Sequence, residues 1–422
     1  LLNRFKRNFS KKTNRLAFES RILQKKLRSA SKEQIHKFHD LKLRLLLNYV
    51  YKNNNYYRNI MQSNNFNRKG KNIIYELSKL PVTTKTDLKN NFNEITDTNI
   101  PLSERRTVYT SGSTELPFKF FNDLKREVPH VTAAASIALE DFGLDHFSFF
   151  NKLNIKFQPK GTPLLRSKTF SNKFKNYFGA SYSLPSVELH NTSKEKVLSS
   201  ITENRIKLIY GYSQSVYHLL RMIEDSLHKT SITHVMCISE PLFAEQREYI
   251  EKKMGIKVSV HYGSTECMRV AFDSGIHGEY CVDLINHHVE TSKKNNEIIV
   301  TNLNNFCFPF IRYAIGDSGT LVNSEEMKFP ILKDIDGRSG IFIINTLGNK
   351  FNTAGFSVFF MHKKYNHNDS NKFVKRFQII QNEDLSLDVN LEMEPNFGSE
   401  KDYVERTVKD LRNFLRDQNI GI

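Results

Sequence analysis

Residues 206–261 read IKLIYGYSQSVYHLLRMIEDSLHKTSITHVMCISEPLFAEQREYIEKKMGIKVSVH, and this stretch decides the fold class. Short runs rich in Ile, Val and Leu alternate with longer segments whose apolar residues recur at helical spacing. These strand-like and helix-like segments follow one another at 206–210, 213–226, 235–238, 242–254 and 258–261. Strands that alternate with helices in this way are typical of parallel sheets. The stretch therefore predicts an α/β fold with a substantially parallel sheet.

The pattern changes on both sides of this stretch. Upstream, apolar spacing predicts helices at 11–30, 33–50 and 126–140, and Thr84 fits the N-cap of a helix beginning near Lys85. From about residue 278, short strands separated by turns indicate a mixed sheet or a small barrel, at 297–301, 310–313 and 319–322. The remainder is again α+β, with strands near 341–345, 374–381 and 385–393 and a helix at about 399–417.

A domain boundary near Arg338 follows from this change of pattern. We expect a large N-terminal domain over residues 1–337, in which mixed and parallel sheets are packed with helices. A small, mobile α+β C-terminal domain is expected over residues 338–422, and the chain is expected to stop short within it. Residues 1–80 form a basic helical extension of the large domain.

The positive charge of the chain lies at its N-terminal end. The sequence has 62 Lys and Arg against 45 Asp and Glu, and residues 1–80 hold 20 of the former and 4 of the latter. Residues 11–30 form a basic amphipathic helix that either packs on the body of the protein or meets an anionic partner such as a lipid surface. Nothing resembling a nucleic-acid recognition module accompanies the charge, so we expect no nucleic-acid partner.

Neither a transmembrane helix nor a secretion signal is expected from the sequence. No run of 18 apolar residues occurs, and no charged-then-apolar stretch ends in a small-residue cleavage site. The four cysteines are scattered without a CxxC pair, which is typical of free thiols in a cytosolic protein. We expect a cytoplasmic protein, with peripheral contact at the inner face of the membrane through residues 1–80 as the alternative. Because the chain begins at Leu1, we expect a trimmed N-terminus.

A loop crowded with hydroxyl groups follows the strand-like Val108-Tyr109. Residues 110–117 read TSGSTELP, and Lys119 comes shortly after. Backbone N–H groups and hydroxyls around one Gly can wrap phosphate oxygens, and Lys119 can add a charge nearby. The spacing of a Walker A loop is absent, so the string fits either a phosphate cradle or an ordinary Ser/Thr/Gly turn.

Two later strings end strands with polar side chains. His261-Tyr-Gly-Ser-Thr-Glu266 follows a strand, where side chains of a parallel sheet face the ligand crevice. There Tyr262 can lie against a base, Thr265 can contact phosphate and Glu266 can hold a divalent ion. Phe310-Ile-Arg-Tyr-Ala-Ile-Gly-Asp317 ends on a carboxylate that can accept both hydroxyls of a ribose. Either string by itself also fits a turn.

A fourth string, Asp336-Gly-Arg338, places a guanidinium where the architecture changes, within reach of phosphate or ribose. In their order and separations the four strings resemble the adenylate-forming superfamily of acyl-CoA synthetases and peptide-synthetase adenylation domains. Within it the chain is most similar to the phenylacetate–CoA ligase and CapK-like branch. Further segments that carry this resemblance lie at 56–58, 80–88, 209–219 and 239–250.

The resemblance implies a site for ATP and Mg²⁺. Ser239 and Glu240 would border the adenine, Tyr262 would stack on it, and Asp317 would hold the ribose hydroxyls. Arg312 would join the phosphate or ribose shell. The full set of implied nucleotide-binding residues is Thr110, Ser111, Gly112, Ser113, Thr114, Lys119, Ser239, Glu240, Tyr262, Gly263, Ser264, Arg312 and Asp317.

Three residues would take part in the chemistry that the resemblance implies. Thr265 would contact the α-phosphate or the substrate carboxylate, Glu266 would bind Mg²⁺, and Arg338 would follow the nucleotide as the C-terminal domain moves. A small carboxylic acid would attack the α-phosphorus of ATP while pyrophosphate leaves. The acyl group would then pass to a thiol, amine or hydroxyl.

The identity of the acceptor leaves three readings open. The first is a CapK-like ligase of surface or capsular polysaccharide biosynthesis, which joins the acid to a sugar intermediate. The second is an aryl- or acyl-CoA ligase, for which CoA is the acceptor. The third is a catalytically degenerate nucleotide-binding scaffold.

Three departures from the family pattern favour that third reading or a shortened chain. Glu115 stands where the family usually has Gly, and a carboxylate beside phosphates is electrostatically costly. Ser339-Gly340 replaces an acidic hinge residue after Arg338. The late catalytic Lys has no counterpart, since Lys401 and Lys409 lie in a helix-like stretch.

Overall fold

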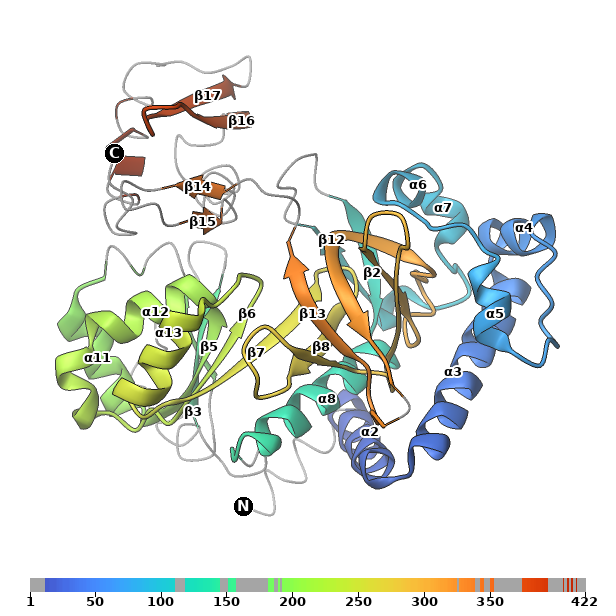
Figure 1. Cartoon of the computed structure of the whole chain (residues 1–422), viewed down its shortest axis with the longest axis horizontal. Coiled ribbons are helices and arrows are strands. Elements are labelled where there is room, and N and C mark those ends of the chain that lie inside the picture. Colours follow the sequence, from blue (N-terminus) through green and yellow to red (C-terminus); the bar gives the residue numbers. More distant parts are fainter. Residues whose placement is uncertain are drawn as a thin grey trace. The chain divides into compact units, whose positions relative to one another are not determined.

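The computed structural model forms two compact units (Figure 1). Unit 1 comprises Leu1–Phe147 and Ser259–Ser339, and unit 2 comprises Ser148–Val258 and Gly340–Ile422. The division expected at residue 338 stays a prediction. The residues that the structure describes are 12–110, 118–144, 151–156, 181–185, 189, 192–324, 326–337, 342–344, 350–352, 374–393, 405, 408–409, 411–412 and 415.

Unit 1 begins with helices, and their ends follow local sequence signals. Ser31 caps the second helix through a capping box with Gln34, and Thr84 caps α6 through a capping box with Asp87, as predicted. The predicted helices at 11–30, 33–50 and 126–140 are confirmed within a few residues. The helices of unit 1 are α2 (Lys12–Ser29), α3 (Lys32–Asn53), α4 (Asn55–Ser63), α5 (Ile73–Ser78), α6 (Lys85–Asn90), α7 (Phe92–Ile95) and α8 (Glu127–Asp141).

The strands of unit 1 form a small hairpin and a run of antiparallel neighbours. In the hairpin, β1 (Arg105–Tyr109) pairs with β2 (Lys119–Asp123), and Tyr109 lies opposite Lys119. The other strands are neighbours in the order β10-β11-β12-β13-β9-β8-β7. Their bounds are β7 (Lys257–Ser264), β8 (Met268–Asp273), β9 (Tyr280–Val282), β10 (His287–Thr291), β11 (Glu297–Asn302), β12 (Tyr313–Val322) and β13 (Ile331–Asp336).

Unit 2 contains the parallel strands that the opening stretch predicts. Four of its strands are neighbours in the order β6-β5-β3-β4, and each described pair among them is parallel. The strands are β3 (Asn151–Lys156), β4 (Ser181–Pro185), β5 (Ile206–Tyr212) and β6 (His234–Ile238), with helices α11 (Lys194–Glu203), α12 (Ser213–Met222) and α13 (Ala244–Glu248). The predicted α/β class is therefore confirmed, and the parallel pairs of the strands β3 to β6 lie in unit 2.

The C-terminal strands of unit 2 form two separate antiparallel pairs. β14 (Phe342–Ile344) pairs with β15 (Lys350–Asn352), and β16 (Val374–Gln381) pairs with β17 (Leu387–Met393). The strands predicted near 341–345, 374–381 and 385–393 are thus confirmed. The helix predicted at 399–417 lies mostly outside the described residues.

The core of unit 1 joins the N-terminal helices to the segment before β12. Leu43, Leu46 and Leu47 of α3 belong to the same buried cluster as Phe120 of β2 and Phe310. Phe120 and Phe310 meet edge to face with ring centroids 5.4 Å apart. This packing ties the β1–β2 hairpin to the body of the unit.

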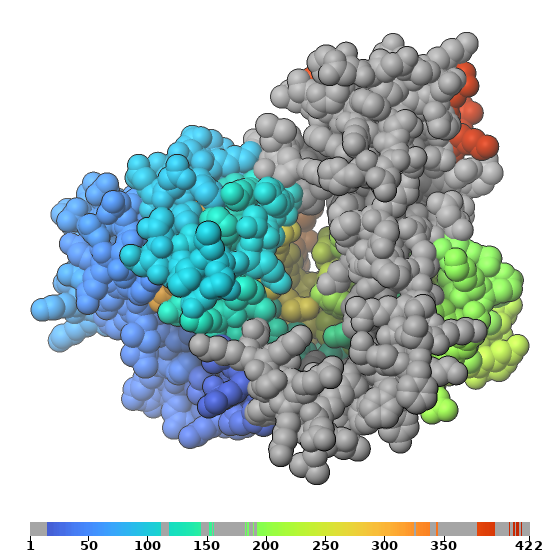
Figure 2. Space-filling view, turned by 180° about the vertical axis from the view of Figure 1, so that it is seen from behind, coloured from blue at the N-terminus to red at the C-terminus, as the bar shows by residue number. Residues whose placement is uncertain are grey.

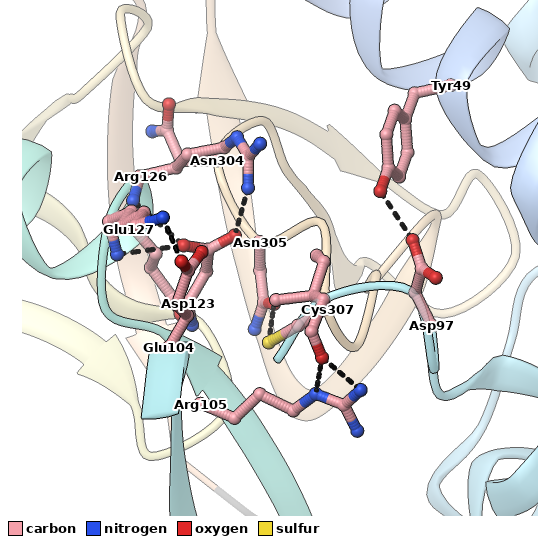
Figure 3. Close-up of polar contacts among 12 residues, drawn as sticks. Tyr49, Asp97, Glu104, Arg105, Asp123, Arg126, Glu127, Asn304, Asn305 and Cys307 are labelled. Atoms are coloured by element: carbon pink, nitrogen blue, oxygen red, sulfur yellow. Dashed lines mark hydrogen bonds and ion pairs between the residues drawn. The ribbon is translucent and has the colours of Figure 1, made fainter. Parts of the chain in front are cut away.

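Buried hydrogen bonds also hold β2 of the β1–β2 hairpin (Figure 3). The carboxylate of Glu127, at the start of α8, accepts hydrogen bonds from Asn122 Nδ2 at 3.0 Å and Asn302 Nδ2 at 2.7 Å. Asn305 Nδ2 donates to the carbonyl oxygen of Phe121 at 2.8 Å. Burial raises the pKa of Glu127 to about 7. Because buried polar groups are costly without partners, these bonds hold β2 in one position.

The basic N-terminal helix packs on the protein, as one of the two readings expected. α2 runs beside α8 (Figure 1), and Lys25 pairs with Glu140 at 2.6 Å. Within the described residues, no helix combines the length and apolar character that crossing a bilayer requires. All four cysteines are free thiols, as predicted.

Candidate functional site

The hydroxyl-rich loop at 110–117 is closed at its base. Thr110 N donates to Phe118 O at 2.9 Å, and Phe118 N donates to Thr110 Oγ1 at 3.0 Å. These two bonds hold the ends of the loop together and continue the β1–β2 ladder. The Thr110 hydroxyl keeps its own hydrogen to donate, so a phosphate contact stays compatible with this geometry. The predicted phosphate-binding residues Ser111, Gly112, Ser113 and Thr114 lie outside the described residues, as does Glu115.

Lys119 lies at the start of β2 among aromatic rings. Its ammonium nitrogen is 5.5 Å from the ring centroid of Phe92 and 5.5 Å from that of Phe121. Such a position is a cation–π contact, which is favourable without an acidic partner. The predicted contribution of Lys119 to phosphate binding stays a prediction.

The string at the end of β7 forms a tight turn into β8. A Cβ atom on Gly263 would lie 1.7 Å from the carbonyl oxygen of Met268, so only glycine fits there. Ser264 Oγ accepts from Cys267 N at 3.0 Å, which closes the turn. Thr265 is exposed at its tip. The close approach at Gly263 and the bond of Ser264 therefore fix the backbone on which Thr265 is exposed.

Tyr262 and Asp317 are brought together by the pairing of distant strands. Tyr262 Oη donates to Asp317 Oδ2 at 2.9 Å, although the two residues are 55 positions apart. The resemblance implies that one stacks on the adenine and the other holds the ribose. Their contact places both groups within the span of one nucleoside.

Glu266 is held by a tyrosine that the sequence did not single out. Its side chain is 1% exposed, and its Oε1 accepts from Tyr313 Oη at 3.1 Å. Tyr313 is equally buried and opens β12, the strand that also carries Asp317. The sequence signal that could have identified Tyr313 is its position in the same string as Asp317, four residues before it. We call Tyr262, Glu266, Tyr313 and Asp317 the Tyr/carboxylate cluster.

Two N-terminal segments that carry the family resemblance, 56–58 and 80–88, bond to the residues at and before the start of β12. Thr83 forms a parallel bridge with Tyr313, in which Thr83 N donates to Arg312 O at 2.8 Å and Ala314 N donates to Thr83 O at 2.9 Å. Tyr57 Oη donates to Pro309 O at 2.9 Å. These bonds from Tyr57 and Thr83 hold the backbone on which Tyr313 lies.

Arg312 has its partners on another side of this strand. Its Nε and one terminal nitrogen each lie 3.1 Å from the carboxylate oxygens of Glu290, and its other terminal nitrogen donates to Ser78 O at 2.9 Å. Burial raises the pKa of Glu290, and the guanidinium of Arg312 counteracts that rise. Together with a bond to Leu80 O, these contacts use four of the five N–H groups of Arg312, which leaves one for a phosphate or ribose contact.

Ser239 and Glu240 lie in unit 2, directly after β6. Ser239 has a left-handed backbone, with φ of 65°. The carboxylate of Glu240 accepts from Gln214 N at 3.1 Å, and its carbonyl accepts from Ser213 Oγ at 2.7 Å, both at the start of α12. Glu240, one of the two residues predicted to border the adenine, therefore also bonds to the first turn of α12. Arg338, the third predicted catalytic residue, lies outside the described residues.

The acidic residues of the Tyr/carboxylate cluster fit a Mg²⁺ ion that takes most of its ligands from the substrate and from water. Among the described residues, no three or more His, Cys, Asp or Glu side chains are grouped to hold a metal. Mg²⁺ is commonly bound through one or two carboxylates together with substrate phosphates and water. A single buried carboxylate such as Glu266 suits that mode of binding.

One similar sequence is protein CapK of Staphylococcus aureus, which is 23% identical over 312 residues. The match covers 70% of this chain and 66% of CapK, so the chain spans slightly less than two thirds of that relative. No family model matches the chain.

Solved structures of 2-hydroxyisobutyryl-CoA ligase share the architecture. An open conformation in complex with 2-HIB-AMP and CoA gives a TM-score of 0.54 at 13% identity and covers 90% of each chain. The postadenylation state with 2-HIB-AMP gives 0.56 at 13% identity and covers 93% of this chain and 85% of that one. The chain therefore has the fold of the adenylate-forming ligases, and its sequence resembles that of the CapK-like branch.

Proposed function

We propose that this protein activates a small carboxylic acid with ATP as an acyl-adenylate and then transfers the acyl group to an acceptor. The observation that carries the proposal is the Tyr262–Asp317 contact, which joins the implied adenine and ribose ligands within one unit. Glu266 lies four residues after Tyr262 and is tied to the strand of Asp317 by Tyr313. The fold and the resemblance to CapK support the same chemistry.

In the first half-reaction, an oxygen of the substrate carboxylate bonds to the α-phosphorus of ATP. The bond between that phosphorus and the pyrophosphate oxygen breaks, and pyrophosphate leaves with its electron pair. No covalent bond to the protein forms. Catalysis then depends on in-line positioning and on the stabilisation of negative charge.

Each described residue has a defined part in this proposal. The Tyr262 ring lies against the base while its hydroxyl orients Asp317, whose carboxylate accepts the ribose hydroxyls. Thr265 donates to the α-phosphate or the substrate carboxylate. The loop at 110–117, closed at its base by Thr110, wraps the β- and γ-phosphates.

Glu266 would hold Mg²⁺, and Tyr313 would hold Glu266. A bound Mg²⁺ neutralises phosphate charge and helps to align the nucleotide. The hydrogen bond from Tyr313 limits the rotation of the Glu266 carboxylate, so the group that would hold Mg²⁺ is oriented before the nucleotide binds. Arg338 is kept as the residue that follows the nucleotide in the second half-reaction.

The acceptor is proposed from the resemblance to CapK. We propose an amine or hydroxyl of a sugar intermediate in surface or capsular polysaccharide biosynthesis, with the enzyme in the cytoplasm or at the inner face of the membrane. CoA is the second candidate, because a structure with the same fold is a complex with 2-HIB-AMP and CoA.

Pyrophosphate exchange with a panel of carboxylic acids tests the first half-reaction. Exchange that depends on both acid and Mg²⁺ supports the proposal. If ATP binds but no acid supports exchange, the protein is the degenerate scaffold that Glu115 favours. Where exchange occurs, product formation with CoA or with amino and hydroxyl sugars distinguishes the two acceptors.

A further inference from the structure

The first described helix packs on the protein through its polar side. Ser20, Arg21 and Gln24 of α2 are buried against α8. Arg21 Nε donates to Ser136 Oγ at 2.8 Å, and Gln24 Nε2 donates to His130 O at 2.9 Å. These are specific hydrogen bonds between buried groups, so they fix the rotation of α2 about its axis.

This orientation leaves apolar side chains of α2 in solvent. Ile22 is 55% exposed and Leu23 is 38% exposed. At 100° per residue, Arg15 and Lys26 lie within about 40° of Ile22 around the helix, so basic and apolar groups share one side. We call Arg15, Ile22, Leu23 and Lys26 the outward face of α2. Figure 2 shows part of the dark blue N-terminal segment at the surface of the molecule. A helix that buries polar groups and exposes apolar ones points to a partner for the exposed side.

The charge of this region selects the kind of partner. Helix α2 has six Lys and Arg against Glu19 alone, and residues 1–11 add four more basic residues without an acidic one. The inward cations have acidic partners on α8, since Lys25 pairs with Glu140 and Arg28 pairs with Asp141. On the outward side, Arg15 pairs with Glu19 of the same helix at 2.8 Å, and both Arg15 and Lys26 are exposed.

An anionic lipid surface matches both properties of the outward face. Basic side chains are attracted to phospholipid headgroups, while Ile and Leu insert below them. A nucleic-acid backbone would engage the cations and leave the apolar residues without partners. The hydrogen bonds and ion pairs between α2 and α8 are made by other residues of the helix, namely Ser20, Arg21, Gln24, Lys25 and Arg28.

We propose that the outward face of α2 docks on an anionic lipid bilayer. The inference goes beyond the proposed activity, and lipid binding is measured without ATP, acid or acceptor, so either can fail alone. In the cell, docking would bring the proposed ligase to acceptors carried at the membrane surface.

Sedimentation of the full chain with vesicles tests the proposal. We expect binding to phosphatidylcholine vesicles that contain phosphatidylglycerol and none to vesicles of phosphatidylcholine alone. The variants I22Q/L23Q and R15E/K26E should each reduce binding by about ten-fold or more. The matched controls are L102Q/I276Q, which replace exposed apolar residues, and K229E/K257E, which reverse two exposed charges.

The outcomes separate docking from general electrostatic attraction. Loss of binding in both α2 variants but in neither control supports the proposal. Equal losses in K229E/K257E and R15E/K26E, or unchanged binding of I22Q/L23Q, would overturn it, as would absence of binding to the anionic vesicles. Since all the replaced side chains are exposed, thermal unfolding should show the variants folded.

Discussion

Arg312 and Tyr313 are neighbours in the chain, yet they belong to two different regions of unit 1. Arg312 reaches Glu290 and the carbonyl of Ser78, which tie β10 and the end of α5 to the entry of β12. Tyr313 reaches Glu266, a residue of the Tyr/carboxylate cluster. One region holds a carboxylate with a guanidinium, and the other holds a carboxylate with a hydroxyl. The difference teaches that one short string can combine scaffold and proposed chemistry, because the backbone turns at Arg312, which has φ of 48° just before β12 begins.

The largest expected effect distinguishes the carboxylate of Glu266 from that of Glu290. Glu266→Gln should lower pyrophosphate exchange by about 10²-fold or more, because the proposed Mg²⁺ ligand loses its charge. Glu290→Gln is the matched control and should act on stability instead. Exchange rates and urea unfolding of both variants check this. Equal exchange rates in the two variants would show that Glu266 is not a metal ligand.

The next effect concerns the scaffold side of the comparison. Arg312→Met should lower the free energy of unfolding by about 2–3 kcal/mol, because it leaves the Glu290 carboxylate partly buried without its cation. Urea unfolding measures the loss. The resemblance instead implies a nucleotide contact for Arg312. A large rise in KM for ATP with unchanged stability would favour that role over the scaffold role.

A smaller effect is expected for the hydroxyl that orients Glu266. Tyr313→Phe should lower kcat of exchange about five-fold and raise the Mg²⁺ concentration needed for half-maximal rate, because one hydrogen bond of about 1 kcal/mol is lost. Tyr49→Phe is the matched control, since Tyr49 Oη also donates to a carboxylate, that of Asp97. A Mg²⁺ dependence that shifts equally in both variants would contradict a positioning role.

The smallest effect tests the hydrogen bond by which Thr83 holds the backbone next to Tyr313. Thr83 Oγ1 donates to Ile311 O at 2.8 Å in a buried position. Thr83→Val should cost about 1 kcal/mol of stability, whereas Thr83→Ser should retain the bond and most of the stability. Thermal unfolding of the two variants makes the comparison. If Thr83→Ser is the less stable of the two, the hydroxyl is not what the brace requires.

The helices show how far periodicity alone reaches. Apolar spacing predicts both α2 and α3, and both exist. In α3 the buried face is largely apolar, with Leu43, Leu46 and Val50 in the core. In α2 the buried face is polar, because Arg21 and its neighbours meet hydrogen-bonding partners on α8. Helical periodicity therefore identifies an element but not the side that it buries when polar partners compete with the core.

The candidate site divides in a similar way. The strings containing Tyr262, Glu266 and Asp317 are visible in the sequence because each has side chains suited to nucleotide or Mg²⁺ binding. The structure places Tyr262 within β7 and Asp317 within β12, where the sequence predicted positions at the ends of strands. Tyr313 was missed because nothing local marks its hydroxyl as a partner of a residue 47 positions away. The bonds of Arg312 to Glu290 were missed for the same reason.

By itself, the sequence determined the α/β class, the parallel strands of the 206–261 stretch, the N-cap at Thr84 and the order of the polar strings. These follow from local periodicity, capping and turn chemistry, which act over a few residues. Only the tertiary structure decided that Tyr262 meets Asp317, that Tyr313 holds Glu266, that Arg312 meets Glu290 and that α2 turns Ile22 outward. Those contacts depend on strand pairing and helix packing between segments far apart in the chain, which local sequence preferences do not specify.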